Sequence, residues 1–165
     1  EDIYLKVTDL VTNFYTSRGI VKALDKISFS IRKGEIFGMV GESGCGKSVT
    51  ALSIMDLIPD PPGRVVSGKV EIDGFNIFSD LANIARIEVR SQTNVKVKRN
   101  KRAMKRHNFM LSKIRGKKAG MIFQEPSLSL NPVLRAGEQI TENILLHNKK
   151  PIADSLINRA NLSLD

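Results

Sequence analysis

Gly41-Glu42-Ser43-Gly44-Cys45-Gly46-Lys47-Ser48 matches the pattern G-x-x-x-x-G-K-[ST] of a phosphate-binding loop. Its glycines let the backbone curl so that successive N–H groups point inward at a phosphate chain. Lys47 can reach the β- and γ-phosphates of a nucleotide, and the Ser48 hydroxyl suits Mg²⁺. A glycine-rich turn with an accidental lysine is the alternative, so the flanking residues have to decide between the two.

The flanking residues provide the strand and the helix that such a loop requires. Residues 36–40 form an apolar run without alternation, as expected of a strand buried on both faces of a parallel sheet. Residues 47–58 have apolar positions near helical spacing and end before Pro59. A helix that begins here adds unpaired N–H groups and the positive end of its dipole. The sequence therefore predicts nucleotide binding.

The remaining elements are expected on both sides of the loop. Apolar residues alternate over residues 4–10 and 20–31, with the turn-prone Ser17-Arg18-Gly19 between them, so two antiparallel strands fit. The later expected elements are a strand at 70–72 with an Asp73-Gly74 turn, a buried strand at 119–123, and helices at 136–146 and 152–162.

Residues 76–113 give the weakest pattern and much of the positive charge. The apolar residues that could begin a helix there are Leu81, Ile84, Ala85 and Ile87. The basic arm, defined as residues 96–118, has eleven Lys and Arg and no acidic residue. Because the whole chain carries a net charge of +9, the remaining residues sum to about −2, the difference between +9 and +11. The basicity therefore belongs to one segment.

The composition is that of an ordinary globular domain, with 41% hydrophobic and 26% charged residues. No apolar run approaches the length of a membrane helix, and no signal peptide pattern opens the chain at Glu1. The single cysteine, Cys45, excludes an internal disulfide or a cysteine metal cluster. His107 and His147 lie far apart, so we predict no metal site from them.

Further stretches carry a family resemblance. In chain order they are Gly34-Glu35 before the apolar run, Pro62-Gly63-Arg64-Val65-Val66-Ser67-Gly68, Met121-Ile122-Phe123-Gln124-Glu125-Pro126, and Ser129-Leu130-Asn131-Pro132. Together with the loop they resemble ATP-binding subunits of ABC transporters, most closely the dipeptide and oligopeptide (peptide and nickel) importer type. The stretch around Gln124 resembles the Q-loop of that family. The resemblance covers residues 4 to about 75 and 114 to 165.

The resemblance implies an α/β fold: a P-loop NTPase of the ABC ATPase type. It would have an N-terminal antiparallel β region, a core with parallel strands and a truncated helical subdomain. The nucleotide-binding core would span residues 1–125, with a basic insertion at about 76–113. Residues 126–165 would begin the helical subdomain.

The resemblance also assigns roles to matched positions. Lys47 and Gln124 would be catalytic, and Ser48 and Gln124 would bind the metal. Adenine would stack on an aromatic residue of the first hairpin; Phe14 aligns best, Tyr15 is adjacent, and a core aromatic is the alternative. The expected nucleotide-contacting residues are Phe14, Tyr15, Gly41, Glu42, Ser43, Gly44, Cys45, Gly46, Lys47, Ser48 and Val49.

An intact protein of this kind would hydrolyse ATP with Mg²⁺ and drive import of peptides or related small solutes. Its expected partners are transporter membrane subunits and a second ATP-binding subunit, as a homo- or heterodimer at the cytoplasmic face of the cell membrane. The chain departs from the pattern because no LSGGQ-type signature, Walker B strand ending in Asp-Glu or switch histidine follows Gln124. We therefore expect little hydrolysis from the chain as given.

Two other functions stay open at this point. A nucleic-acid-linked P-loop ATPase could use the basic arm, and a non-catalytic nucleotide-binding fragment is the third possibility. The arm itself could be a solvated surface insertion, or it could attract anionic lipid headgroups or nucleic acid. Phe109 is its only aromatic residue, so a base-stacking platform is missing and nucleic acid is not an expected partner. We expect deletion of residues 92–110 to leave ATP affinity within a few-fold.

Overall fold

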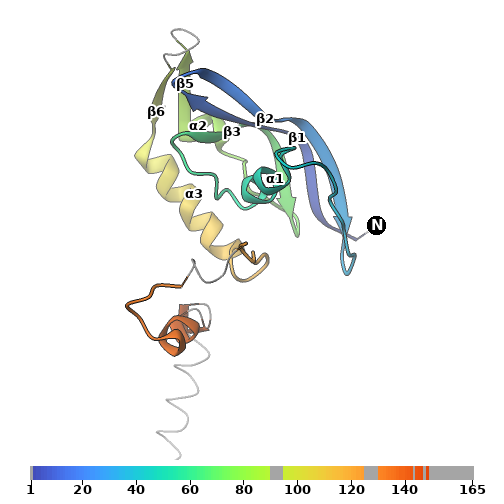
Figure 1. Ribbon diagram of the computed structural model, residues 1–165, viewed down its shortest axis with the longest axis vertical. Helices are drawn as coiled ribbons and strands as arrows, with labels where there is room; N and C mark the ends of the chain where they lie inside the picture. Colours follow the sequence, from blue (N-terminus) through green and yellow to red (C-terminus); the bar gives the residue numbers. More distant parts are fainter. Residues whose placement is uncertain (1, 90–94, 125–129, 143, 147, 149–165) are drawn as a thin grey trace, which may run out of the picture. The chain divides into compact units, whose positions relative to one another are not determined.

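The computed structural model describes residues 2–89, 95–124, 130–142, 144–146 and 148 (Figure 1). The chain divides into two compact units, Glu1–Ala119 and Gly120–Asp165. The first unit contains all of the strands and the helices that Figure 1 labels.

The first unit is built on an antiparallel sheet whose strands lie in the order β2-β1-β3-β4. Their bounds are β1 (Ile3–Thr16), β2 (Gly19–Arg32), β3 (Gly63–Ile72) and β4 (Phe75–Asn76). In Figure 1, β1 and β2 form a long twisted ribbon. The two predicted N-terminal strands, the turn between them and the strand predicted at residues 70–72 are confirmed, although each strand is longer than the pattern indicated.

In the part of this unit that the structure describes, three helices and a small hairpin accompany the sheet. The helices are α1 (Lys47–Ile54), α2 (Leu81–Ile84) and α3 (Lys101–Ile114), and the hairpin pairs β5 (Ala85–Val89) with β6 (Val95–Arg99). Most of the buried apolar side chains of the unit form one cluster: Val7, Leu10, Leu24, Val65, Val70, Ile72, Ile77, Phe78, Leu111 and Ile114. Val49 and Ile54 of α1 also pack against this cluster, which ties the helix after the phosphate-binding loop to the sheet.

Helix α1 ends four residues before the predicted end at residue 58. Asp56 has a left-handed backbone conformation with φ of 49°, which breaks the helical path. Arg115 donates from Nε and Nη2 to the Met55 carbonyl at 2.9 and 2.6 Å, and also from Nη2 to the Asp56 carbonyl. The two carbonyl groups that follow the helix are therefore satisfied by a distant side chain, while those of Ala51, Leu52 and Ser53 accept from nearby backbone N–H groups.

The parallel strands predicted at residues 36–40 and 119–123 are not formed in the described part of the chain. Ile36 and Val40 are 99% and 96% exposed, and Ile122 is 96% exposed. Phe37 stacks on Phe29 of β2 with 5.1 Å between the ring centroids, but the run pairs with no strand of the described residues. A strand buried on both faces needs neighbours that supply backbone partners and cover, and the described residues offer none to these runs.

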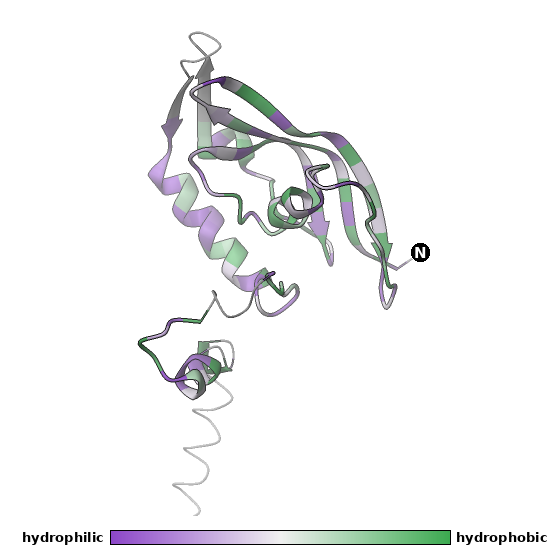
Figure 2. Ribbon diagram, in the orientation of Figure 1, coloured by the Kyte–Doolittle hydropathy of each residue, from purple (hydrophilic) through white to green (hydrophobic). Residues whose placement is uncertain are grey.

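The basic arm is only in part a solvated insertion. Its middle forms α3, and His107, Leu111 and Ile114 on one side of that helix are buried. Hydrophilic and hydrophobic residues both occur along α3 in Figure 2. Deletion of residues 92–110 would remove His107 and most of α3. We therefore no longer expect this deletion to leave ATP affinity within a few-fold.

In the second unit, residues 136–142 and 144–146 are helical, as predicted. The Gln139 side chain accepts from the Asn131 backbone N–H at 2.9 Å and donates to the Asn131 carbonyl at 3.1 Å, which holds the segment before the helix. The helix predicted at 152–162 lies outside the described residues.

Candidate nucleotide-binding site

The side chain of Lys47 folds back onto the phosphate-binding loop. Lys47 Nζ donates to the Gly41 carbonyl at 2.6 Å and to the Glu42 carbonyl at 2.7 Å, and lies 3.4 Å from Cys45 Sγ. The ammonium group thus lies between residues 41–42, at the start of the loop, and the helix that follows the loop. No carboxylate among the described residues contacts this ammonium group, so no neighbouring negative charge offsets its attraction for a phosphate.

Glycine is required at the point where the loop enters α1. Gly46 has φ of 95°, and a Cβ at this position would lie 3.0 Å from both the Ala23 carbonyl oxygen and Leu24 Cδ2. The loop therefore runs directly against β2. Gly46 is also the N-cap of α1 and provides no side chain to cap it, so the N–H groups of the first helical turn are left for a ligand.

The far side of α1 is anchored to the sheet. The Thr12 and Ser53 hydroxyl groups, both fully buried, form a hydrogen bond of 2.9 Å between β1 and α1. Thr50 donates from its hydroxyl to the Gly46 carbonyl at 2.9 Å within the first turn. The Thr12–Ser53 bond thus fastens the second half of α1 to β1, and the Thr50 bond closes the first turn next to the loop.

The residues present fit a triphosphate with Mg²⁺. Ser48, the second residue of α1, is exposed beside the loop, and its hydroxyl can serve as one metal ligand. The described residues contain no cluster of three or more His, Cys, Asp or Glu that could hold a metal ion on its own. A cation here would therefore take its other ligands from phosphate oxygens and water, which is the usual behaviour of Mg²⁺.

Phe14 and Tyr15, the two candidates for adenine stacking, are half-buried on β1. Phe14 lies against the backbone of Gly63, where a Cβ would be 2.7 Å from its ring and 2.4 Å from Ile58 Cγ2. Such a contact partly supports the alternative of a packed core aromatic. The Tyr15 backbone N–H donates to the Pro62 carbonyl at 2.8 Å. The choice between the two rings stays a prediction.

Gln124 is exposed and belongs to the second unit. Its predicted contact with the metal or the attacking water would join residues of both units, and it stays a prediction. Glu42, Ser43, Gly44 and Cys45 are exposed along the loop, and Val49 is half-buried in α1.

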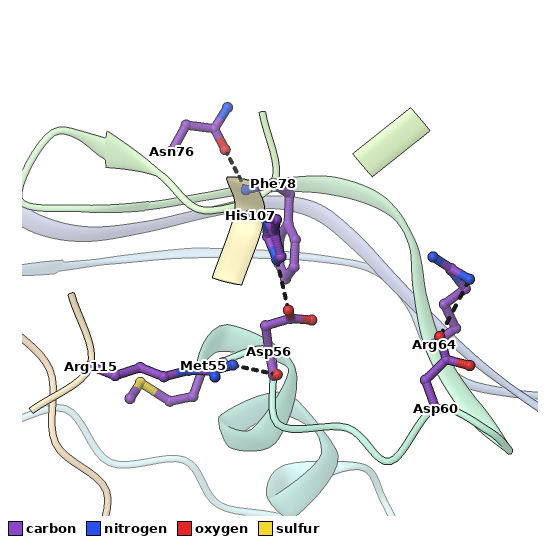
Figure 3. A network of polar contacts seen from close by, with 8 residues as sticks. All are labelled: Met55, Asp56, Asp60, Arg64, Asn76, Phe78, His107 and Arg115. Carbon is purple, nitrogen blue, oxygen red and sulfur yellow. Dashed lines mark hydrogen bonds and ion pairs between the residues drawn. The ribbon is translucent and has the colours of Figure 1, made fainter. Parts of the chain in front are cut away.

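Sequence reasoning missed a polar network that holds the end of α1 (Figure 3). His107 Nε2 and Asp56 Oδ2 are 2.8 Å apart, and His107 is 5% exposed. Burial lowers the pKa of Arg115 from its ordinary value, and the nearby Asp56 charge opposes that shift. His107 belongs to α3, and the signal that could have revealed α3 is the spacing of its inward residues, which are Met104, His107, Leu111 and Ile114.

A glycine-rich loop with this residue pattern, followed directly by a helix without a side-chain cap, is the arrangement typical of the P-loop class. The family model described as ABC transporter matches residues 24–164. The chain therefore belongs to the ABC transporter family, as the sequence resemblance predicted.

The similar curated proteins are ATP-binding proteins of peptide transport. The probable peptide ABC transporter ATP-binding protein y4tR of Sinorhizobium fredii is 36% identical over 94% of this chain and 38% of its own length. The oligopeptide transport ATP-binding protein OppD of Bacillus subtilis is 39% identical over 88% and 33%. The dipeptide transport ATP-binding protein DppD of Escherichia coli is 39% identical over 87% and 36%. The chain thus spans little more than a third of these relatives.

Cys45 allows a direct test of the site. Its thiol is exposed in the loop, 3.4 Å from Lys47 Nζ. A maleimide attached to Sγ would occupy the space next to the ammonium group, so we expect labelled protein to lose ATP binding. Bound Mg-ATP should slow the labelling, measured as adduct formation by mass spectrometry. Equal labelling rates with and without Mg-ATP would remove Cys45 from the site.

Proposed function

We propose that this chain binds Mg-ATP at residues 41–49. The observation that carries the proposal is the position of Lys47 Nζ across the loop, 2.6 and 2.7 Å from two backbone carbonyls, at the start of an uncapped helix. Phosphates would occupy the loop and the first-turn N–H groups, and Lys47 would reach the β- and γ-phosphates. Ser48 would hold Mg²⁺, and Phe14 or Tyr15 would stack on the base.

The whole protein would couple ATP hydrolysis to the import of peptides or related small solutes. Membership in the ABC transporter family and the names of the similar relatives support this. No helix among the described residues is long and apolar enough to cross a membrane. Family membership and the relatives support separate membrane subunits that would provide the pathway, with the ATP-binding subunit at their cytoplasmic face and paired with a second ATP-binding subunit.

Catalysis in that assembly would use Lys47 for charge stabilisation and Gln124 for the metal or the attacking water. Residues 1–125 would form the nucleotide-binding core, and residues 126–165 would begin the helical subdomain. Because the chain belongs to the ABC transporter family, we do not propose a nucleic-acid-linked ATPase.

Titration with a fluorescent ATP analogue tests the nucleotide site directly. We expect saturable binding in Mg²⁺ with a Kd below about 1 mM, competed by ATP. AMP should compete much more weakly, because it lacks the β- and γ-phosphates that the loop would hold. Omission of Mg²⁺ should weaken binding. Competition by AMP as strong as that by ATP would contradict a site built around Lys47.

A further inference from the structure

The outward face of α3 carries five exposed cations: Lys101, Arg102, Lys105, Arg106 and Lys113. At 3.6 residues per turn these side chains lie within an arc of roughly 140° around the helix axis. His107, Leu111 and Ile114 lie on the other side and are buried in the core of the unit. The packing of that buried side fixes the cationic face outward.

These five cations are not used to hold the fold. Among the described residues, none of them is paired with a carboxylate. Other cations of the basic arm are used in this way: Arg99 contacts Asp60 at 2.6 Å, and Lys118 contacts Asp73. The hydrogen bond from Lys118 lowers the pKa of Asp73. The arm therefore contains structural cations and a separate unpaired set.

Phe109 lies inside the cationic arc and is 64% exposed. Lys113 Nζ lies 4.7 Å from the centroid of its ring, and Ser112 donates to the Phe109 carbonyl at 2.8 Å. An exposed apolar ring beside several cations offers both kinds of group that attach a protein to an anionic membrane, a side chain for the acyl boundary and charges for the headgroups. There the ring enters the boundary of the acyl chains while the cations meet anionic headgroups.

We propose that this face of α3 binds an anionic lipid surface, with Phe109 inserted and the five cations on the headgroups. Charge complementarity carries the choice of partner, because residues 96–118 contain no acidic residue. Nucleic acid fits less well, since binders of single strands stack successive bases on several aromatic residues and α3 offers one. The proposal goes beyond nucleotide binding and does not depend on it.

Co-sedimentation with vesicles tests this assignment. The chain should bind mixed phosphatidylglycerol–phosphatidylcholine vesicles, should not bind pure phosphatidylcholine vesicles, and should be released by high salt. Each cation near such a surface changes partitioning by about fivefold. Joint replacement Lys101→Gln, Arg102→Gln, Lys105→Gln and Arg106→Gln should therefore lower it by at least about a hundredfold. Phe109→Ala should lower it several-fold with the salt dependence unchanged.

A matched control replaces four exposed cations outside the arm: Lys6→Gln, Arg18→Gln, Lys22→Gln and Lys33→Gln. It removes the same charge and should bind the mixed vesicles at least tenfold more strongly than the α3 variant. Circular dichroism and Mg-ATP titration would show that both variants are folded. Equal losses in the two variants would overturn the proposal. So would binding to an RNA or DNA oligonucleotide that is tighter than vesicle binding and is lost with the same α3 substitutions.

Discussion

Replacement of Lys47 by alanine should lower the affinity of this chain for Mg-ATP by at least about a hundredfold, or about 3 kcal/mol. Two effects contribute. The variant loses the only cation in the loop, and with it charge-assisted hydrogen bonds to the phosphates. It also loses the contacts of Nζ with the Gly41 and Glu42 carbonyls, which hold the loop closed before ATP arrives.

The measurement is a titration of wild type and variant with the fluorescent analogue, with circular dichroism to verify the fold. Lys33→Ala is the matched control, because Lys33 is an exposed lysine near the loop in sequence but outside it. It should bind as wild type does. Lys47→Arg keeps the charge but not the compact ammonium geometry, so it should restore part of the affinity at most. Wild-type affinity in Lys47→Ala would refute the site.

Replacement of Leu111 by alanine should lower the free energy of unfolding of the first unit by about 2–5 kcal/mol. Leu111 is 1% exposed, and it lies in the same buried cluster as Val70 and Ile77. The substitution removes buried apolar surface and leaves a cavity that the surrounding residues fill only in part. A loss of this size is a large fraction of the total stability of an ordinary domain.

Urea denaturation followed by circular dichroism measures this change as a lower midpoint with a similar slope. The exposed neighbour Ser112 offers the control: Ser112→Ala should change the free energy of unfolding by no more than about 0.5 kcal/mol. If the two variants unfold at the same urea concentration as wild type, α3 does not belong to the core and the basic arm is a solvated insertion after all.

Local patterns were sufficient for the hairpin and the loop. The alternation of apolar and polar residues along β1 and β2 indicates that one face of each strand is buried. The turn at Ser17-Arg18-Gly19 joins two strands that are neighbours in the sheet. The loop is recognisable because glycine, lysine and serine are needed at fixed offsets. Helix α3 was predictable in principle from its inward residues, but eight cations between 96 and 113 conceal that spacing. Long Lys and Arg side chains on the outward face of a helix do not indicate whether its opposite face is buried.

The sequence by itself determined the family, the phosphate-loop motif and the antiparallel start of the fold, because each depends on residues close together in the chain. Only the tertiary structure decided that Arg115 binds the Met55 carbonyl just after α1, that Asp56 contacts the buried His107, and that part of the basic arm enters the core. It also decided that residues 36–40 remain exposed. These features depend on partners many residues away, and the pairing of distant groups is set by the packing of the whole unit and not by local spacing.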